Sequence, residues 1–248
     1  MMLNETTVAK LYEMKLGSMA KTFRAQANDN NIHELSFDER FGLIVDAEWT
    51  TRKNNRLARL IRNASYDIPS ASVEDIEYHA ERKLNKDMIT RLATCNYIEE
   101  KHNIIIMGAT GNGKTYLANA LGMTASRKFY TVKYIRLPEL LGELAIARGE
   151  GRYAKVFKQY KQVKLLIIDE WLLFSLSTND SMEVLELVNA RHKRASTIFC
   201  SQFPKDAWHD KIGETAVADA ICDRIVHDSY NIVIHGDGMR KRKGLKDS

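Results

Sequence analysis

The chain has 248 residues, of which 44% are hydrophobic and 28% charged, as is typical of a globular protein with a substantial core. The sequence contains no apolar run near the ~20 residues needed to cross a membrane, no signal-peptide pattern, and three cysteines without metal-ligand spacing. We therefore expect a cytoplasmic protein with no membrane partner. The net charge of +5 favours an anionic partner only weakly.

Residues 1–67 are predicted to form a small all-helical domain. Apolar residues recur at helical spacing over 11–27 and 39–49, and Phe41, Ile44 and Val45 are expected to face inward. The segment Ser-Phe-Asp-Glu that begins at Ser36 is typical of a capping box.

A turn at Asp67-Ile68-Pro69-Ser70 predicts the end of this domain. Residues 68–102 are expected to be a connector with a helix over 86–94.

A basic helix is expected near 49–62, and a second basic cluster lies in the C-terminal tail. The cations of the two clusters are Arg52, Lys53, Arg56, Arg59 and Arg62, and Arg240, Lys241, Arg242, Lys243 and Lys246. Two such clusters favour contact with a nucleic-acid backbone. The alternative is a solvated helix face and an ordinary charged tail.

Strands and helices alternate from residue 103 onward, which predicts a domain over 103–248 with a five-stranded parallel sheet flanked by helices. The expected strands are 103–107, 131–136, 164–169, 196–200 and 230–235, and the expected helices lie near 115–127, 138–148, 152–161, 181–193 and 216–227.

A glycine-rich loop follows the first strand and opens a helix, which is the order that a phosphate-binding P-loop requires. Glycines let successive backbone N–H groups point at phosphate oxygens, and the helix adds its positive end. Lys114 is expected at the β- and γ-phosphates of ATP, and Thr115 at Mg²⁺. The predicted nucleotide-contacting residues are Gly108, Ala109, Thr110, Gly111, Asn112, Gly113, Lys114, Thr115 and Tyr116. The alternative is a glycine turn that happens to carry Lys-Thr.

Two acids end the third strand. The run 164–168 is hydrophobic on both faces, as in a central parallel strand, and Asp169 and Glu170 follow it. Acids at this end of a strand lie in the crevice where parallel sheets bind ligands. Asp169 suits an outer-shell Mg²⁺ role, and Glu170 suits the base that polarises an attacking water.

The connection between the second and third strands contains an extra helix, 152–161. Arg152 and Lys155 lie in it, with Tyr153, Phe157 and Tyr160 interleaved. Aromatic residues among cations are able to stack on nucleic acid, or they form the buried face of an amphipathic helix.

These motifs and their order resemble the AAA+ ATPases. The strand that ends in Ser201-Gln202 is similar to the sensor strand of the DnaC/IstB-like clade, so Ser201 or its neighbour Gln202 is implied to contact the γ-phosphate or the attacking water. The segment 218–227 resembles the helix that carries this clade's arginine finger, which implies that Arg224 reaches the nucleotide of a neighbouring subunit. Without the resemblance, Arg224 would be read as a surface ion-pair residue.

The resemblance to IstB-type proteins, the ATPase helpers of transposases, runs from about residue 11 to 242. It includes Leu35–Leu43, Asp46–Trp49, Arg136–Leu141, Ser201–Pro204 and the Asp223-Arg224 helix. It implies a homo-oligomer, a ring or spiral with ATP between subunits, that assembles on double-stranded DNA, deforms the target site and presents it to a transposase.

Two departures limit the resemblance. Residues 236–248 are too few for the helical lid of most AAA+ proteins, so no C-terminal lid domain is expected. Gly238 replaces the usual serine of the terminal motif, which leaves Arg240 without an assigned role.

Three other functions remain as alternatives. A replicative helicase loader of the DnaC type shares the core but should carry a helicase-binding N-terminal domain. A small-molecule P-loop kinase lacks an evident acceptor site. A DNA clamp that binds ATP with scarcely any hydrolysis is disfavoured by Glu170.

Overall fold

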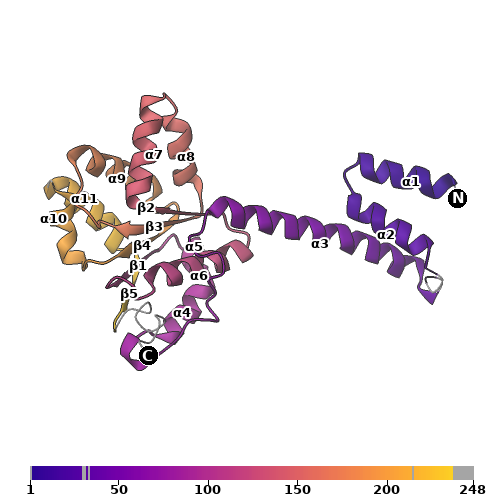
Figure 1. Cartoon of the computed structure of the whole chain (residues 1–248), viewed down its shortest axis with the longest axis horizontal. Coiled ribbons are helices and arrows are strands. Elements are labelled where there is room, and N and C mark those ends of the chain that lie inside the picture. Colours follow the sequence, from indigo (N-terminus) through magenta and orange to yellow (C-terminus); the bar gives the residue numbers. More distant parts are fainter. Residues whose placement is uncertain (1, 30–31, 33, 214, 237–248) are drawn as a thin grey trace, which may run out of the picture. The chain divides into compact units, whose positions relative to one another are not determined.

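The computed structural model describes residues 2–29, 32, 34–213 and 215–236, and the chain divides into two compact units, Met1–Arg59 and Leu60–Ser248 (Figure 1). The predicted basic tail at 240–246 lies outside the described residues, as does Arg240 itself. The same holds for 237–248, the segment on which the absence of a lid was predicted. The predicted domain limits at 67 and 102 remain predictions.

The described elements of the smaller unit are helices. These are α1 (Met2–Glu13), α2 (Gly17–Ala27) and the first part of α3 (Phe37–Ala64). One helix was predicted over 11–27, but Lys15 has a left-handed backbone (φ 59°) and separates α1 from α2. A single residue in this conformation interrupts the α-helical hydrogen-bond ladder.

Helix α3 is one element of 28 residues where two helices were predicted. No proline interrupts it, so the helical pattern continues across the expected junction. The capping box is present, because the Ser36 amide donates to Glu39 Oε2 over 2.8 Å and the Glu39 amide donates to Ser36 Oγ over 3.3 Å. Ile44 is buried as predicted, whereas Phe41 and Val45 are 51% and 40% exposed, so their expected inward orientation was wrong.

Five parallel strands form the sheet of the larger unit, in the order β2-β3-β4-β1-β5 (Figure 1). They are β1 (Asn103–Gly108), β2 (Val132–Arg136), β3 (Leu165–Trp171), β4 (Ser196–Ser201) and β5 (Ser229–Ile234). The predicted strands and their parallel arrangement are confirmed. β3 lies between β2 and β4, which explains why its sequence is apolar on both faces.

Helices cover both faces of this sheet. Alternate side chains of β1 enter different clusters, with Ile105 in one and Ile104 and Ile106 in the other. The Ile105 cluster contains residues of α7 (Leu137–Gly149), α8 (Tyr153–Gln162), α9 (Thr178–Arg191), α10 (Trp208–Ile212) and α11 (Thr215–Val226). The other cluster contains residues of α4 (Lys86–Ala93), α5 (Asn96–Glu99) and α6 (Lys114–Arg127).

Much of the expected connector packs against the sheet as part of the larger unit. Ile76 and Leu92 lie in the same core cluster as Ile104. Just before the connector, the Tyr66 hydroxyl hydrogen-bonds the Ser126 hydroxyl at 2.7 Å, and burial raises the Tyr66 pKa. This segment therefore supports the helix that follows the glycine-rich loop.

Arg191 is a buried cation at the end of α9, with only 3% of its surface exposed. Burial lowers the pKa of its guanidinium, which has no carboxylate partner among the described residues. Its acceptors are the backbone carbonyls of Tyr160, Lys161, Val163 and Ser196 and the Thr197 hydroxyl. Arg191 thus satisfies the C-terminal carbonyls of α8 and ties that helix to β4.

We expect Arg191→Met to lower the free energy of unfolding by about 3 kcal/mol or more, because it leaves several buried carbonyls without a donor. Arg194→Met is the matched control, since Arg194 is exposed three residues along the chain. Urea denaturation followed by circular dichroism measures both variants. Equal unfolding midpoints for the two variants would contradict this structural role.

Candidate functional site: a nucleotide site at the carboxyl edge of the sheet

The glycine-rich loop connects the end of β1 to the start of α6, as predicted. Gly111 and Gly113 have φ values of 83° and 88°, a conformation that side chains disfavour. Gly108 is required for a different reason, because a Cβ there would lie 2.6 Å from the Ile234 carbonyl oxygen. The loop is thereby held against the end of β5 while its backbone curls before α6.

Lys114 is folded back onto the loop. Its ammonium donates to the carbonyl oxygens of Gly108 at 2.7 Å and Ala109 at 2.9 Å. Burial lowers its pKa, an effect that nearby Cys200 and Asp169 oppose. A buried ammonium held only by neutral carbonyls would gain from an anionic ligand at the loop, so the site fits a phosphate group.

Asp169 joins three parts of the fold at the end of β3. Its Oδ2 accepts from the Thr115 hydroxyl at 2.6 Å and from the Tyr134 hydroxyl at 3.0 Å, and its Oδ1 accepts from the Glu170 amide at 2.8 Å. A carboxylate beside a hydroxyl oxygen is the kind of oxygen pair that Mg²⁺ binds in nucleotide sites. Thr115 and Asp169 therefore fit the metal role that the sequence predicts.

Tyr134 was not singled out by the sequence. It lies on β2 and is buried, and burial beside Asp169 raises its pKa, so the hydroxyl stays protonated and donates. Its partner is 35 residues away in the chain, and no local pattern links the two.

Glu170 lies in β3 but has an irregular backbone conformation. Its φ of 54° and that of Leu172, 55°, are left-handed values that are unusual for such residues. The Glu170 carboxylate lies 3.9 Å from the Arg136 guanidinium. Arg136 also pairs with Asp67 at 3.1 Å and with Glu139 at 3.7 Å. The candidate base is therefore 36% exposed and lies beside a cation.

The end of β4 places Gln202, rather than Ser201, against the loop. Gln202 Oε1 accepts from the Thr110 hydroxyl at 2.8 Å. Ser201 is fully buried, where its hydroxyl donates to the Trp171 carbonyl and accepts from the Phe203 amide. Of the two residues considered from the sequence, only Gln202 has a side chain that contacts the loop.

A second support of the loop had no sequence signal. Arg82, in the 3₁₀ helix Ala80–Arg82, donates to the Asn112 carbonyl at 3.1 Å and to the Glu77 carbonyl at 2.6 Å. The Asn112 side chain in turn donates to the Ile234 carbonyl at 3.1 Å. These contacts fix the outer side of the loop.

Tyr116 is one of the residues predicted to contact the nucleotide, and it lies in the first turn of α6. Its hydroxyl exchanges hydrogen bonds with the backbone of Ser72, at 3.3 and 3.4 Å, so it anchors the segment before α4 to α6.

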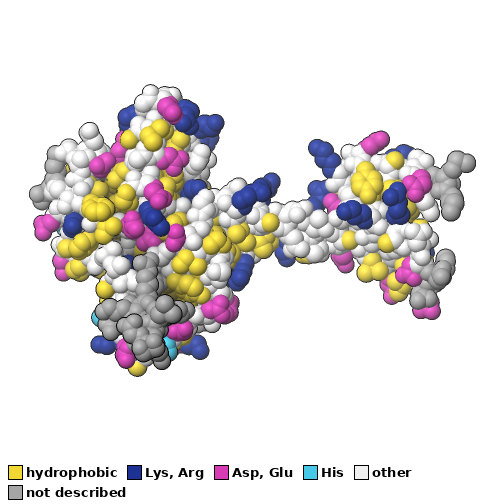
Figure 2. Space-filling model, viewed as in Figure 1, with side chains coloured by type: hydrophobic (Ala, Val, Ile, Leu, Met, Phe, Trp, Pro, Cys, Tyr) yellow, Lys and Arg dark blue, Asp and Glu magenta, His cyan; other side chains and the backbone are white. Residues whose placement is uncertain are grey.

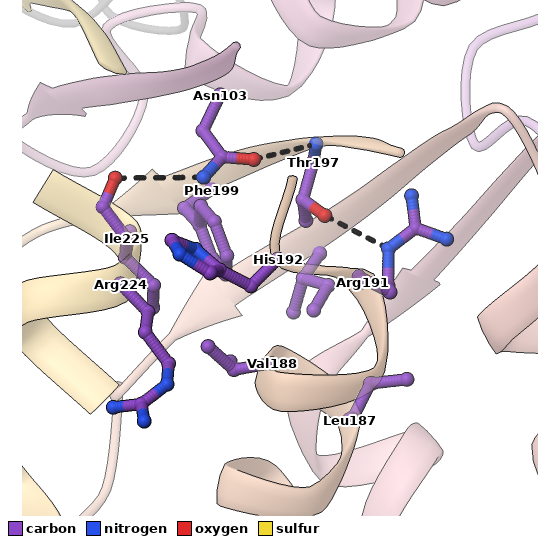
Figure 3. Close-up of a pocket in the computed structure, with 10 residues that line it drawn as sticks. Asn103, Leu187, Val188, Arg191, His192, Thr197, Phe199, Arg224 and Ile225 are labelled. Carbon is purple, nitrogen blue, oxygen red and sulfur yellow. Dashed lines mark hydrogen bonds between the residues drawn. The ribbon is translucent and has the colours of Figure 1, made fainter. Parts of the chain in front are cut away.

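Arg224 lies at the opposite edge of the sheet. Its guanidinium donates to the Ala220 carbonyl at 2.7 Å, and the adjacent Ile225 carbonyl accepts from Asn103, the first residue of β1 (Figure 3). Gly108 ends β1 about 16 Å away at ~3.3 Å per residue, farther than an arginine side chain extends. The pocket that Arg224 lines holds only about 20 Å³, too little for a nucleotide.

The predicted DNA-contacting cations lie on exposed helix surfaces. On α3, Arg52 pairs with Glu48 at 2.7 Å, and the Lys53 ammonium lies 4.6 Å from the Trp49 ring centre. Arg56 and Arg59 are exposed on the same helix.

The predicted cations of the extra helix are also exposed. Arg152 pairs with Glu150, and Lys155 lies on the outer surface of α8. Phe157 and Tyr160 are buried, so the aromatic residues of α8 form its inner face and are not a stacking surface.

The sheet, the loop and the acids at this edge have the arrangement of the P-loop AAA+ fold. The sheet matches that of DnaA from Aquifex aeolicus bound to AMPPCP, with a TM-score of 0.58 at 20% identity over 69% of this chain and 52% of that one. It also matches the DnaC helicase loader, with a TM-score of 0.57 at 18% identity over 66% of this chain and 96% of that one.

Comparison of the sequence with known families and relatives shows the family of this chain. Residues 9–247 match the family described as IstB-like ATP binding protein, and the chain belongs to this family. It is 38% identical over 245 residues to an insertion-sequence ATP-binding protein of Sinorhizobium fredii, covering 99% of this chain and 100% of that protein. It is likewise 38% identical to the ATP-binding protein of insertion sequence IS1162 from Pseudomonas fluorescens, over 82% of this chain and 88% of the relative. The family resemblance read from the sequence is thereby confirmed.

Within the described ranges, the structure contains no helix long and apolar enough to span a membrane.

We expect Tyr134→Phe to raise about tenfold the Mg²⁺ concentration needed for tight binding of a fluorescent ATP analogue, because Asp169 loses one orienting donor. Tyr130→Phe is the control, since it removes a similar bond, from the Tyr130 hydroxyl to Glu99, away from the loop. Thermal unfolding of both variants should stay close to that of the unmodified protein. The same Mg²⁺ dependence in both variants would show that Tyr134 does not position Asp169.

Proposed function

We propose that the protein is an ATPase that assembles with ATP on double-stranded DNA, deforms the target site and delivers it to a transposase. The observation that carries this proposal is the joint placement of Lys114, Thr115, Asp169 and Glu170 at one edge of the sheet. The relatives' names, which place them in insertion sequences, support the link to transposition.

The loop residues bind and orient ATP. Backbone N–H groups of residues 108–115 surround the β-phosphate. The Lys114 ammonium leaves the two loop carbonyls and donates to phosphate oxygens instead. Thr115 and Asp169 hold Mg²⁺, which when bound neutralises charge on the phosphates. Tyr134 keeps the Asp169 carboxylate in position.

Glu170 accepts a proton from the attacking water. To do so its carboxylate must leave Arg136, with which it is paired at 3.9 Å. Gln202, which directly follows β4 and contacts Thr110 of the loop, is the polar residue best placed to sense the γ-phosphate. We therefore assign the sensor role to Gln202 in place of Ser201.

Arg224 acts on the nucleotide of a neighbouring subunit. Its position at the far edge of the sheet separates it from its own loop, so it is able to contact ATP only across an interface. An arginine at the transferring phosphate is worth ~10³ or more in rate in well-studied cases. Oligomerisation and ATP hydrolysis are then coupled through one side chain.

Binding of DNA would rest on cations of several subunits. Deforming a site of 20–30 base pairs costs on the order of 1–10 kcal/mol, which backbone contacts from one subunit would hardly offset. The exposed residues Arg52, Lys53, Arg56, Arg59, Arg152 and Lys155 are the proposed contacts. A ring or spiral of subunits contains this set of cations many times.

The second candidate is a helicase loader, which the likeness to the DnaC loader fold favours. Such a protein would bind a replicative helicase through its helical N-terminal unit.

We expect Lys114→Ala and Arg224→Ala each to abolish ATP hydrolysis on duplex DNA, while a mixture of the two regains part of it. In the mixture, an intact loop from one variant meets an intact Arg224 from the other. Phosphate release measures the rate, and Arg127→Ala, another helix-end arginine, is the control that retains activity. Absence of recovery on mixing would place Arg224 outside the neighbour's site.

We also expect the particle mass on duplex DNA to grow to that of a large oligomer only when ATP is present. Glu170→Gln should leave these complexes long-lived, because ATP binds but is not hydrolysed. Mass photometry with and without ATP distinguishes the candidates. A particle that ignores duplex DNA but captures a replicative helicase would favour the loader.

A further inference from the structure

A basic groove runs along the free edge of β2 in the larger unit. It is formed by the end of α3, by β2 and by the end of α8, and has a volume of about 700 Å³. β2 is the outermost strand of the sheet, so nothing in the described chain pairs with this edge. Arg62 of the basic helix lies in its lining, whereas the six residues proposed above as DNA contacts do not.

The chemistry of the groove is that of an anion-binding surface. Arg62 and Lys133 contribute positive charge, Asn63, Gln159 and Gln162 contribute amides, and no acid is part of the lining. Within the described residues, Lys133 donates only to the Ser65 hydroxyl, at 3.0 Å, and Arg62 has no carboxylate partner. Charge that is not neutralised by the protein's own acids is available to a ligand.

Further cations extend the groove along α8. Lys155, Lys158 and Lys161 are exposed on this helix, beside the two glutamines, while Tyr160 and Phe157 bury its other face. Figure 2 shows Lys and Arg side chains on the outer surface of α8. Acids line the adjoining cleft, which shares Ser65 and Lys133 with the groove and also contains Asp67, Glu139 and Glu143.

We propose that this groove binds the phosphodiester backbone of double-stranded DNA. Cations bind phosphates by releasing counterions, and Asn and Gln side chains donate to phosphate and sugar oxygens without reading sequence. Leu60, Val132 and Val163 are the apolar lining residues, and the other residues of the lining are polar or charged, which does not suit an apolar peptide. This inference rests on the proposed DNA-binding function and adds a contact surface to it.

The groove also lies next to the nucleotide site along one strand. Lys133 is in the groove, Tyr134 holds Asp169, and Arg136 pairs with Glu170. A phosphate bound at Lys133 therefore contacts the strand that positions both acids.

The test compares two double variants of the groove with a control variant that removes two cations elsewhere, as many as the first double variant removes. Arg62→Ala/Lys133→Ala should weaken duplex binding at least about tenfold at 0.1 M salt, and should reduce the slope of log K against log salt by about 1.8. Gln159→Ala/Gln162→Ala should weaken binding with an unchanged slope, because neutral amides release no counterions. Lys86→Ala/Lys205→Ala, which removes two cations elsewhere, should match the unmodified protein.

Fluorescence anisotropy with a labelled duplex and a single strand of equal length, each with ATP, gives these affinities. If the Arg62→Ala/Lys133→Ala variant has the same affinity and salt slope as the unmodified protein, the groove proposal is overturned. DNA binding by another surface would remain. A single strand bound more tightly than the duplex would overturn the assignment to duplex DNA. Failure of the unmodified protein to bind either nucleic acid would instead overturn the proposed function. Thermal unfolding confirms that each variant is folded.

Discussion

The site depends on one constraint, the common direction of all five strands. Because β1, β3 and β4 are adjacent and parallel, the loop after β1, the acids of β3 and Gln202 after β4 all lie at the same edge. The same constraint places the starts of these strands, and with them Arg224, at the opposite edge. A protein built in this way separates the phosphate-binding loop from its arginine by the length of a strand, which supports the proposal that the two meet across a subunit interface.

At that edge, Asp169 is the residue that connects the other parts of the site. Three hydrogen bonds to one carboxylate connect α6, β2 and the amide of Glu170 in β3. The left-handed backbone at Glu170 costs on the order of 1–3 kcal/mol, and it persists because the neighbouring contacts determine it. Glu170 then lies beside Arg136, whose other partners are Asp67, in the segment after α3, and Glu139, in the helix α7 that follows β2.

The edge strand β2 links the two proposed activities. Lys133 lines the groove, Tyr134 hydrogen-bonds Asp169, and Arg136 pairs with Glu170, so a shift of this short strand would alter all three contacts. Arg191 adds a second connection, since it ties the end of α8 to the start of β4, the strand that Gln202 follows. The Arg191 link joins α8 to β4 through buried hydrogen bonds, which are costly to break.

The sequence by itself determined the strands, the loop from Gly108 to Thr115 and the pair Asp169-Glu170, because each depends on spacing within a few residues. Only the tertiary structure decided which side chains support them. Tyr134, Arg82 and Arg191 act on partners up to 35 residues away, and Gln202 was separated from Ser201 only by the direction in which each side chain points. The exposure of Phe41 and Val45 was likewise missed, since helical periodicity identifies an apolar face but not whether anything covers it. Local patterns follow from backbone geometry, whereas these contacts follow from how distant segments pack.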